Sequence, residues 1–510
     1  MRKFFCFLAV ILFCLAPDMS AQAEGDLGAA LEGFETLPIQ HNGRIMPLKT
    51  FAYLTYEALD DNVKIEGRDF KLDPVRWLVK TVFMPQSGAK IPVIGHEHKL
   101  MSFEQAAALL QKEAALLNEA LSTPPAQQAD EQRTLIKLFN KTERLRGLLN
   151  AFENASRIPI IPDYQFRVIP QDPAWLSPAK AEASAILDLW TQARDAFAAQ
   201  DVDEMRAAFE ALFKETSAVQ PRLETAYQTS ALLHWAFISA IAAAFLYMFS
   251  PLGGFIAIMW GAAFIILETV LRILITARLP IGTLSESILF VVLIFFIFAL
   301  FIKTMRVAKR GGFLAVVIAA LIAAALYFQS PDPLKPLEAV LNTDFWLATH
   351  VVIITAGYAA ALGAAMIAHG LLFSMMRGEK NKPLKRWLKP ALILALALTG
   401  FGTALGGFWA DQSWGRFWGW DPKENGALLI TLWVIWLLHG AHTDQFSKLW
   451  FWVGSAYLSV IVALAWFGVN LLGAGLHSYG FISGIAGGLF TFIVAQTALL
   501  TLFVWRIKKS

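Results

Sequence analysis

The sequence predicts an all-α polytopic membrane protein, with about eight or nine transmembrane helices preceded by a mostly helical exported domain. Hydrophobic residues make up 56% of the 510 residues and charged residues only 16%, which is too apolar for an ordinary soluble protein. The apolar residues are spread unevenly, because residues 24–228 are polar and residues 229–507 are mostly long apolar runs. The net charge of +3, without a dense basic patch, argues against a nucleic-acid partner.

The first 23 residues have the form of a secretory signal peptide. Two basic residues precede an apolar run over residues 4–16, and residues 21–23 form a small-x-small cleavage site. A retained membrane anchor is the alternative. Cys6 and Cys14 are the two cysteines of the chain, so removal of the signal would leave a mature protein without a thiol.

Residues 24–228 follow as an exported domain. Apolar residues recur at intervals of three and four over 103–121, 134–152 and 181–197, which predicts three amphipathic helices. Residues 37–54 have an extended character.

One histidine pair in this domain raises the question of a metal. His96 and His98 alternate with Glu97, as in a strand. A metal site needs at least one further ligand, and none is evident in the sequence. Histidines of a solvated loop are therefore the favoured interpretation.

Residues 229–510 form the membrane half, which has nine apolar runs, most of them about long enough to cross roughly 30 Å of hydrocarbon. Basic residues concentrate in loops 303–312 and 377–389 and in the C-terminal tail, which the positive-inside rule places in the cytoplasm. Nine spans reconcile this rule with an exported N-terminal domain. The runs cover 230–250, 253–275, 285–302, 313–329, 345–375, 389–408, 425–441, 449–468 and 482–505.

Residues 409–425, WADQSWGRFWGWDPKEN, form an outer loop on this topology. Each tryptophan offers a large flat π-surface with one N–H donor. Such a cluster is typical of an aromatic belt at the membrane interface, and it could equally form a platform for a flat aromatic ligand. The four tryptophans of the loop are Trp409, Trp414, Trp418 and Trp420.

Two histidines flank this loop at the same depth. His350 lies at the outer end of the fifth span, and His477 lies in the last outer loop. Two neutral imidazoles can fill the axial positions of a haem iron. The tryptophans would then face the porphyrin, and Arg416 or Lys423 could pair with its propionates. A tetrapyrrole site and an interfacial belt both remain open on these residues.

A second station is plausible at the cytoplasmic side. His439 lies near the inner end of the seventh span, and His369 reaches a similar depth in the fifth. Ionisable residues inside a membrane are costly and usually functional, although His439 could simply extend to the interface. His234 is near the outer end of the first span, so it does not match His439 in depth.

Three charged residues lie within or beside the second and third spans. Glu268 and Arg272 are four residues apart on one helix face and can pair. Glu286 opens the third span. These residues are interpreted as packing and topology devices.

Residues 414–425 resemble the WWD signature of haem-handling proteins, and the continuation DPKENGALL is most similar to the CcsA (ResC) family of system II cytochrome c synthetases. Two further segments agree with that family, FWLATHVVIITAGYAAALGAA around His350 and FGVNLLGAGLHSYGF around His477. Residues 37–52 resemble the exported segment that precedes the CcsA part of fused CcsB–CcsA proteins.

The resemblance implies haem b as the ligand. It implies His350 and His477 as external ligands of the haem iron, and His439 as the ligand of an inner haem station. The tryptophan loop and Asp421 would complete the haem-binding residues. The family's intramembrane partner of His439 normally comes from CcsB (ResB), so the resemblance implies a separate CcsB subunit. Substitution by His369 or His234 within the chain is the weaker alternative.

The expected function is cytochrome c biogenesis. The protein would carry haem to the outer face of the bacterial cytoplasmic (inner) membrane and support its thioether attachment to the CxxCH segment of apocytochrome c, as a component of a cytochrome c haem lyase. Reduced thiols would depend on separate thiol-reducing factors. No residue of the chain is expected to act as a nucleophile. The alternatives are a haem transporter or chaperone that does not attach haem, and a structural scaffold with an aromatic belt.

Overall fold

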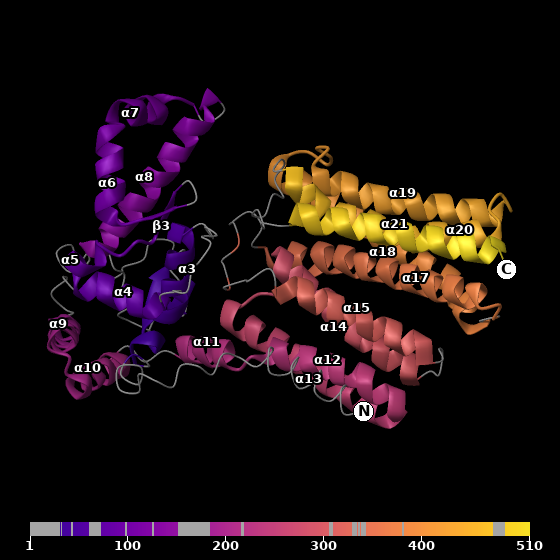
Figure 1. Cartoon of the computed structure of the whole chain (residues 1–510), viewed down its shortest axis with the longest axis horizontal. Coiled ribbons are helices and arrows are strands. Elements are labelled where there is room, and N and C mark those ends of the chain that lie inside the picture. The colour runs from indigo at the N-terminus through magenta and orange to yellow at the C-terminus, as the bar shows by residue number, and fades with distance from the viewer. Residues whose placement is uncertain are drawn as a thin grey trace. The chain divides into compact units, whose positions relative to one another are not determined.

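The computed structural model describes two compact units that meet in the sequence at Ser230 and Ala231 (Figure 1). Each unit is described by itself below. The described residues are 31–509 except 32, 42–43, 61–72, 97–98, 125–126, 151–183, 216–218, 305–309, 329–333, 335–336, 338–342, 380–381 and 473–484.

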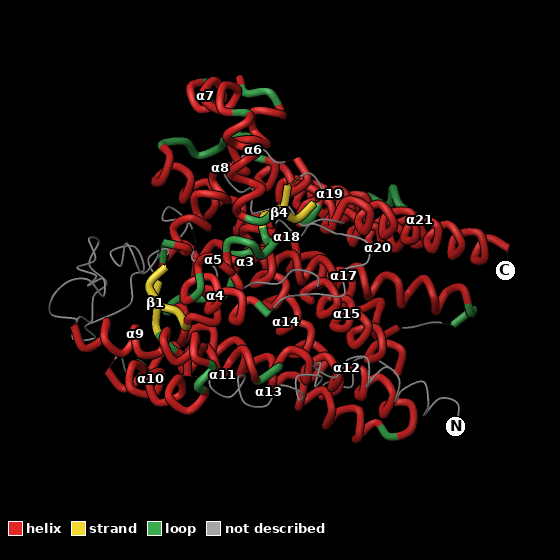
Figure 2. The backbone as a smooth tube through the Cα atoms, turned by 60° about the vertical axis from the view of Figure 1, so that its left-hand side comes forward, coloured by secondary structure: helices red, strands yellow, loops and turns green. Residues whose placement is uncertain are grey.

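The first unit is mostly helical and carries two short antiparallel hairpins, the strands drawn in yellow in Figure 2. The hairpins pair β1 with β2 and β3 with β4, so that Ile39 faces Met46 and Ile94 faces Met101. The elements are β1 (Pro38–His41), β2 (Arg44–Pro47), α3 (Leu48–Asp60), α4 (Pro74–Phe83), α5 (Pro85–Gly88), β3 (Ile94–His96), β4 (Lys99–Met101), α6 (Phe103–Lys112), α7 (Ala114–Ser122), α8 (Asp130–Leu149), α9 (Ser184–Ala199), α10 (Val202–Glu215) and α11 (Val219–Thr229).

Local sequence signals explain several boundaries in this unit. The Ser102 side chain accepts a hydrogen bond from the amide of Gln105, whose own side chain accepts from the amide of Ser102, so a capping box starts α6. The three predicted amphipathic helices are present, with the first divided at Glu113 into α6 and α7. The extended character predicted for residues 37–54 was wrong beyond Pro47, where α3 begins.

The second unit is a bundle of long apolar helices. Figure 1 shows them lying side by side, and α17 packs against both α18 and α20. The elements are α12 (Leu232–Phe249), α13 (Pro251–Thr276), α14 (Leu284–Thr304), α15 (Arg310–Phe328), α16 (Asp344–Trp346), the π-helical turn η4 (Leu347–Val351), α17 (Val352–Met376), α18 (Lys382–Trp414), α19 (Pro422–His442), α20 (Lys448–Trp466), the 3₁₀ turn η5 (Gly468–Leu472) and α21 (Ile485–Lys509).

This bundle confirms the predicted fold class of an all-α polytopic membrane protein. Within the described residues, seven helices are long and apolar enough to cross a membrane. Two shorter apolar helices, Leu284–Leu300 and Val316–Ala325, lie at the third and fourth predicted spans. Each of the nine predicted runs therefore coincides with one apolar helix of the bundle.

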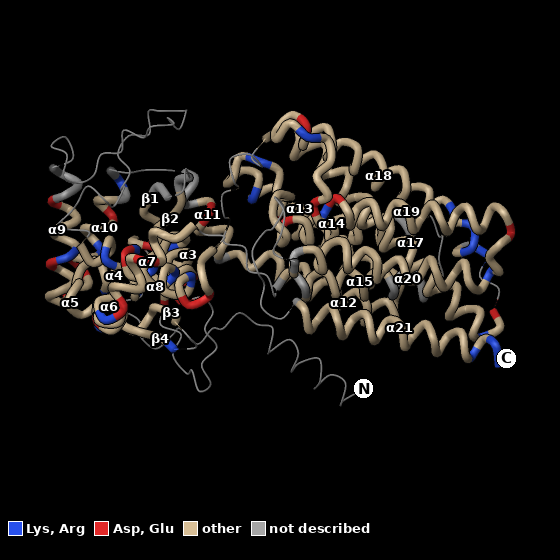
Figure 3. Tube along the Cα trace, turned by 90° about the horizontal axis from the view of Figure 1, so that it is seen from above, with Lys and Arg blue, Asp and Glu red and all other residues tan. Residues whose placement is uncertain are grey.

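The two ends of the bundle differ in chemistry. The end at which α18 stops and α19 starts carries the tryptophans and is called the tryptophan end. The opposite end carries clustered Lys and Arg, the blue segments near the C-terminus in Figure 3, and is called the basic end. There Lys508 lies over the ring of Trp450 and Lys509 over that of Trp505, the cation–π pairing typical of a membrane interface.

A buried ionic cluster joins α13 to α14. Glu286 accepts two hydrogen bonds from Arg278, at 2.8 and 2.9 Å, and one from Arg272 at 3.3 Å. The backbone amides of Gly282 and Thr283 donate to the same carboxylate, at 2.8 and 3.1 Å. The Glu286 and Arg272 side chains are fully buried. The carboxylate thus ties two arginines and the α13–α14 turn together.

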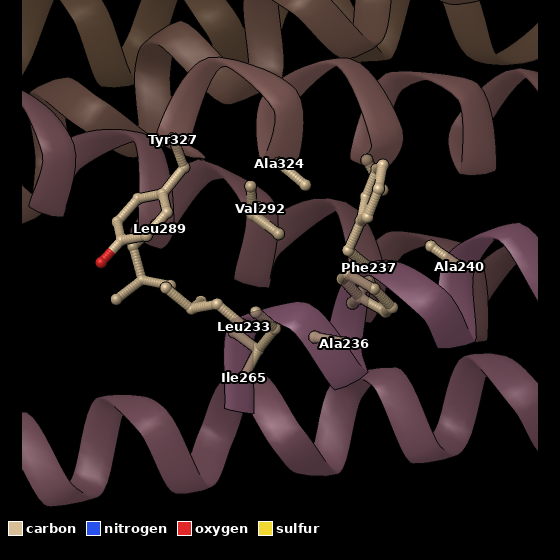
Figure 4. Close-up of a pocket in the computed structure, with 11 residues that line it drawn as sticks. Leu233, Ala236, Phe237, Ala240, Ile265, Leu289, Val292, Ala324 and Tyr327 are labelled. Carbon is tan, nitrogen blue, oxygen red and sulfur yellow. The ribbon is translucent and has the colours of Figure 1, made fainter. Parts of the chain in front are cut away.

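A small apolar cavity lies between α12, α13, α14 and α15 (Figure 4). Its volume is about 10 Å³, which holds one water molecule at most. Apolar side chains line it together with Tyr327, whose hydroxyl oxygen accepts from Arg272 at 3.3 Å. This cavity is far too small to hold a tetrapyrrole.

Candidate haem site at the tryptophan end of the bundle

His350 lies in a π-helical turn at the start of α17. Single π-helical turns inside α-helices are rare and occur often at functional sites. The turn brings His350 against α18, where its Nδ1 donates to the carbonyl oxygen of Gly402 at 2.8 Å. A neutral imidazole that donates from Nδ1 carries its lone pair on Nε2. His350 is therefore held in the tautomer that can ligate a metal through Nε2.

Two glycines of α18 let α17 and the His350 imidazole approach closely. A Cβ atom on Gly406 would lie 2.7 Å from Cε1 of His350, and one on Gly402 would lie 3.0 Å from the backbone of Ile354. Side chains at these positions would push α17 and α18 apart. Neither glycine was predicted from the sequence, although their spacing of four residues on one helix face is a signal of close helix packing.

Trp409 lies beside His350. The two ring centroids are 5.8 Å apart with an interplanar angle of 63°, an edge-to-face arrangement. The Trp409 side chain is 4% exposed, and its Nε1 has no hydrogen-bond partner among the residues that the structure describes. An imidazole and a buried indole donor thus meet between α17 and α18.

The other tryptophans follow from the end of α18 into the α18–α19 connection. Residues 409–421 are called the tryptophan segment. Helix α18 continues to Trp414, so the predicted loop over 409–425 is helical in its first six residues. The chain then reverses at Gly415, where φ is +66°. Trp418 and Trp420 pack edge to face with ring centroids 6.0 Å apart, and Trp420 is 71% exposed.

Asp421 and Glu424 fix the end of this segment. The Asp421 carboxylate accepts from the amide of Lys423 at 2.9 Å, and the Glu424 carboxylate accepts from the amides of Gly419 and Asp421 at 2.9 and 3.1 Å. This reciprocal capping box starts α19 and holds the tryptophan segment against it. The structure therefore gives buried Asp421 a defined role as a helix cap.

Substitution of Asp421 tests whether its carboxylate only caps α19 or also binds the ligand directly. Asn caps a helix about as well as Asp, whereas Ala costs about 1 kcal/mol. We expect Asp421→Asn to keep hydrogen-exchange protection at residues 418–421 and Asp421→Ala to lower it. If the carboxylate charge itself holds the ligand, Asp421→Asn will weaken ligand binding as much as Asp421→Ala does, with protection unchanged.

The two proposed cationic partners are close to this segment. The Arg416 guanidinium lies directly over Gly419, where a Cβ atom would collide with it. Arg416 is exposed and Lys423 is half-buried. Both cations belong to the segment that the capping box holds, so a substitution that breaks the box would also shift these two side chains.

The inner candidates lie elsewhere. His439 is exposed near the end of α19, about 27 Å along the helix from Asp421 at 1.5 Å per residue. His369, on α17, donates from Nδ1 to the carbonyl of Ala365, and its Nε2 meets the buried Gln496 amide of α21. Gln496 was not predicted from the sequence as a neighbour of His369. His234 lies near the start of α12, at the other end of the bundle from His439.

His477, the second predicted haem ligand, lies outside the described residues, as does His98. His96 ends β3. Across the described ranges no three His, Cys, Asp or Glu side chains are grouped as a metal site would require.

The residues at the tryptophan end fit a haem ligand by three observations. The Nε2 lone pair of His350 suits an axial ligand, Gly406 leaves room for the His350 ring, and Trp409 offers an orphaned buried donor. Together with the all-helical bundle, they define a polytopic membrane protein with an imidazole and tryptophan site at one end.

Comparison with known proteins agrees with this class. The family described as "Cytochrome C assembly protein" matches residues 281–477. The chain is 34% identical over 234 residues to "Protein NrfI" of Wolinella succinogenes, covering 42% of this chain and 24% of that protein. It is 28% identical over 259 residues to "Cytochrome c biogenesis protein CcsA" of Prochlorococcus marinus, covering 43% of this chain and 82% of that protein. The CcsA of Mesostigma viride is 29% identical over 243 residues, covering 40% of this chain and 78% of that protein.

Through its membrane half, the chain is similar to the cytochrome c assembly proteins named CcsA and NrfI. It spans about a quarter of the length of NrfI. The family match begins at residue 281 and so leaves the first unit outside it. His350, Gly406 and the whole tryptophan segment fall within the matched residues.

Proposed function

We propose that this protein acts in cytochrome c biogenesis by binding haem b at the tryptophan end of its bundle and presenting it for attachment to apocytochrome c. One observation carries the proposal. The His350 imidazole is held by Gly402 in the tautomer that ligates through Nε2, beside the tryptophan segment. His477 supplies the second axial ligand in this proposal, and Trp414, Trp418 and Trp420 supply aromatic surface around the ligand.

The chemistry that the chain supports is positioning. In thioether attachment, each cysteine thiol of the CxxCH segment adds across one haem vinyl group. A sulfur–carbon bond forms, the vinyl double bond becomes single, and the thiol hydrogen ends on the neighbouring carbon, so the step needs no oxidant. The protein holds the ring still, and its two cysteines both fall in the predicted signal peptide. Separate thiol-reducing factors would keep the substrate thiols reduced.

His439 supports a second contact with haem at the basic end. It is exposed on α19, so a second ligand for a haem bound there can come from another subunit that covers this face. We propose CcsB (ResB) as that subunit. His369 is a poorer candidate because its Nε2 already meets Gln496.

The orientation follows from the charges of the bundle. The basic end faces the cytoplasm by the positive-inside rule, which puts the tryptophan end and the exported domain on the outer face of the bacterial cytoplasmic membrane. Haem would thus be presented in the compartment into which apocytochrome c is exported.

Absorption spectroscopy of the purified protein, alone and with CcsB, tests the proposal. We expect a Soret band with a bis-histidine signature in the wild type. His350→Ala and His477→Ala should remove the outer signature, while His439→Ala should leave it and affect only the inner station. Absence of any Soret band, or a spectrum indifferent to His350→Ala and His477→Ala, would support a structural scaffold and overturn the proposal.

Co-expression with CcsB and an apocytochrome separates haem attachment from haem delivery. Haem that stays bound to the cytochrome after denaturation supports a role in the lyase. Haem that reaches the outer face but never becomes covalent would assign the protein to haem transport alone.

A further inference from the structure

The buried indole N–H of Trp409 differs from three indoles of the bundle that donate hydrogen bonds. Trp346 donates to Gln412 at 3.0 Å, Trp433 donates to the carbonyl of Gly454 at 3.0 Å, and Trp466 donates to Ser287 at 3.1 Å. Trp409 is 4% exposed, yet its Nε1 has no partner in the described part of the chain. Buried polar groups are nearly always hydrogen-bonded, and one left without a partner destabilises the fold.

The position of this donor indicates a ligand. Trp409 lies edge to face with His350, the residue whose Nε2 is set to ligate iron. A buried donor that the fold does not satisfy, next to a binding residue, is the arrangement expected where a bound molecule supplies the acceptor.

We propose that the Trp409 Nε1–H donates to a propionate carboxylate of the haem held by His350. This inference rests on the proposed function and deepens it. The chemistry of the ligand leaves no other acceptor, because the four pyrrole nitrogens bind the iron and the remaining substituents are methyl and vinyl groups. A carboxylate taken into a buried site also needs donors to replace water.

This bond gives Trp409 a role different from those of the exposed tryptophans. Trp420 offers a ring surface to any flat ligand, whereas Trp409 fixes the ring's rotation about the axis of the iron–histidine bond. With its propionate edge held at Trp409, the vinyl edge of the porphyrin points away from α18. Trp409 is thus a residue that orients the reacting groups of the ligand without touching them.

The test compares Trp409→Phe with the wild type in titrations of the purified full chain. Phe keeps an aromatic ring and removes the N–H. Two ligands are titrated, haem and iron etioporphyrin, which carries only methyl and ethyl groups at its rim. We expect Trp409→Phe to weaken haem binding about ten-fold, the loss expected for one hydrogen bond to a charged group. Binding of iron etioporphyrin should stay within two-fold, and the bis-histidine spectrum should be retained for both.

Trp433→Phe is the matched control, because it removes an indole N–H that already donates to a backbone carbonyl. Any loss of affinity that it causes should be equal for the two porphyrins. If Trp409→Phe also weakens both porphyrins equally, or neither, the propionate bond is excluded while the proposed function stands. If the wild type binds no haem, the proposed function fails and this inference fails with it.

Discussion

Replacing Gly406 by Ala will remove the bis-histidine signature of the outer haem site as completely as His350→Ala does. The added Cβ would lie 2.7 Å from Cε1, 3.1 Å from Nδ1 and 3.3 Å from Nε2 of His350. Because the Gly402 carbonyl fixes the ring from the same helix, the imidazole cannot shift without losing that bond. Overpacking costs about 1–3 kcal/mol and a lost hydrogen bond about 1 kcal/mol, which together correspond to a loss of occupancy of roughly 30-fold or more.

The absorption spectrum of the purified variant measures this effect. Gly363→Ala is the control, because Gly363 lies inside α17, the helix that His350 precedes, and a Cβ there would meet nothing within 4 Å. We expect Gly363→Ala to keep the spectrum and to be neutral or slightly stabilising. A wild-type spectrum in Gly406→Ala would show that the imidazole is not confined by α18 and would contradict the geometry described above.

Glu286→Ala should be the most destabilising single substitution in the α13–α14 region. It removes the carboxylate that pairs with Arg272 and Arg278 and that accepts from the amides of Gly282 and Thr283. Removing one partner of a buried ion pair costs about 3–5 kcal/mol, because a charge is left buried without compensation. We expect a large fall in the thermal unfolding midpoint of the detergent-purified protein and in the amount recovered from membranes.

Glu379→Ala provides the comparison. Its pair with Arg377 is exposed, with both side chains about 60% accessible, and exposed pairs contribute about 0–1 kcal/mol. The midpoint of Glu379→Ala should stay near that of the wild type. Equal midpoints for the two variants would mean that the Glu286 cluster is not a stabilising element of the bundle.

Much of the fold could be predicted because membrane helices are set by hydropathy. Long apolar runs determine where a chain can cross, and each predicted run coincides with an apolar helix. Hydropathy did not predict how far a membrane helix continues beyond the membrane into water. Residues 409–414 are too polar for a span, yet nothing in them breaks a helix, and α18 continues to Trp414, just before Gly415. Hydropathy gave equally little information about α3, the helix that begins directly after Pro47 and was not predicted.

The candidate site could be predicted in part. Topology alone placed His350 and the tryptophans at one end of the bundle, as the structure does. The contact of His350 with Gly402, Gly406 and Trp409 depends on how α17 packs on α18, which local spacing does not encode. Spacing suggested Glu268 as a partner of Arg272, and it could not show that Arg272 also pairs with Glu286, which comes from a different helix. Glu286 also accepts from the amide of Thr283 and donates its own amide to the Thr283 hydroxyl, the capping box that Thr-x-x-Glu spacing predicts. Its pairing with Arg278 depends on how the α13–α14 turn folds back, which helix spacing does not encode.

The backbone conformation of Trp420 determines which substitutions at this position would stabilise the protein. Its φ of +56° lies in the left-handed region, which costs a non-glycine residue about 1–2 kcal/mol. Glycine or asparagine would relieve that cost, and the mostly exposed indole contributes little packing in return. A laboratory selection for thermostability alone would therefore tend to discard this tryptophan early. Stability and the aromatic surface of the segment oppose each other at this one position.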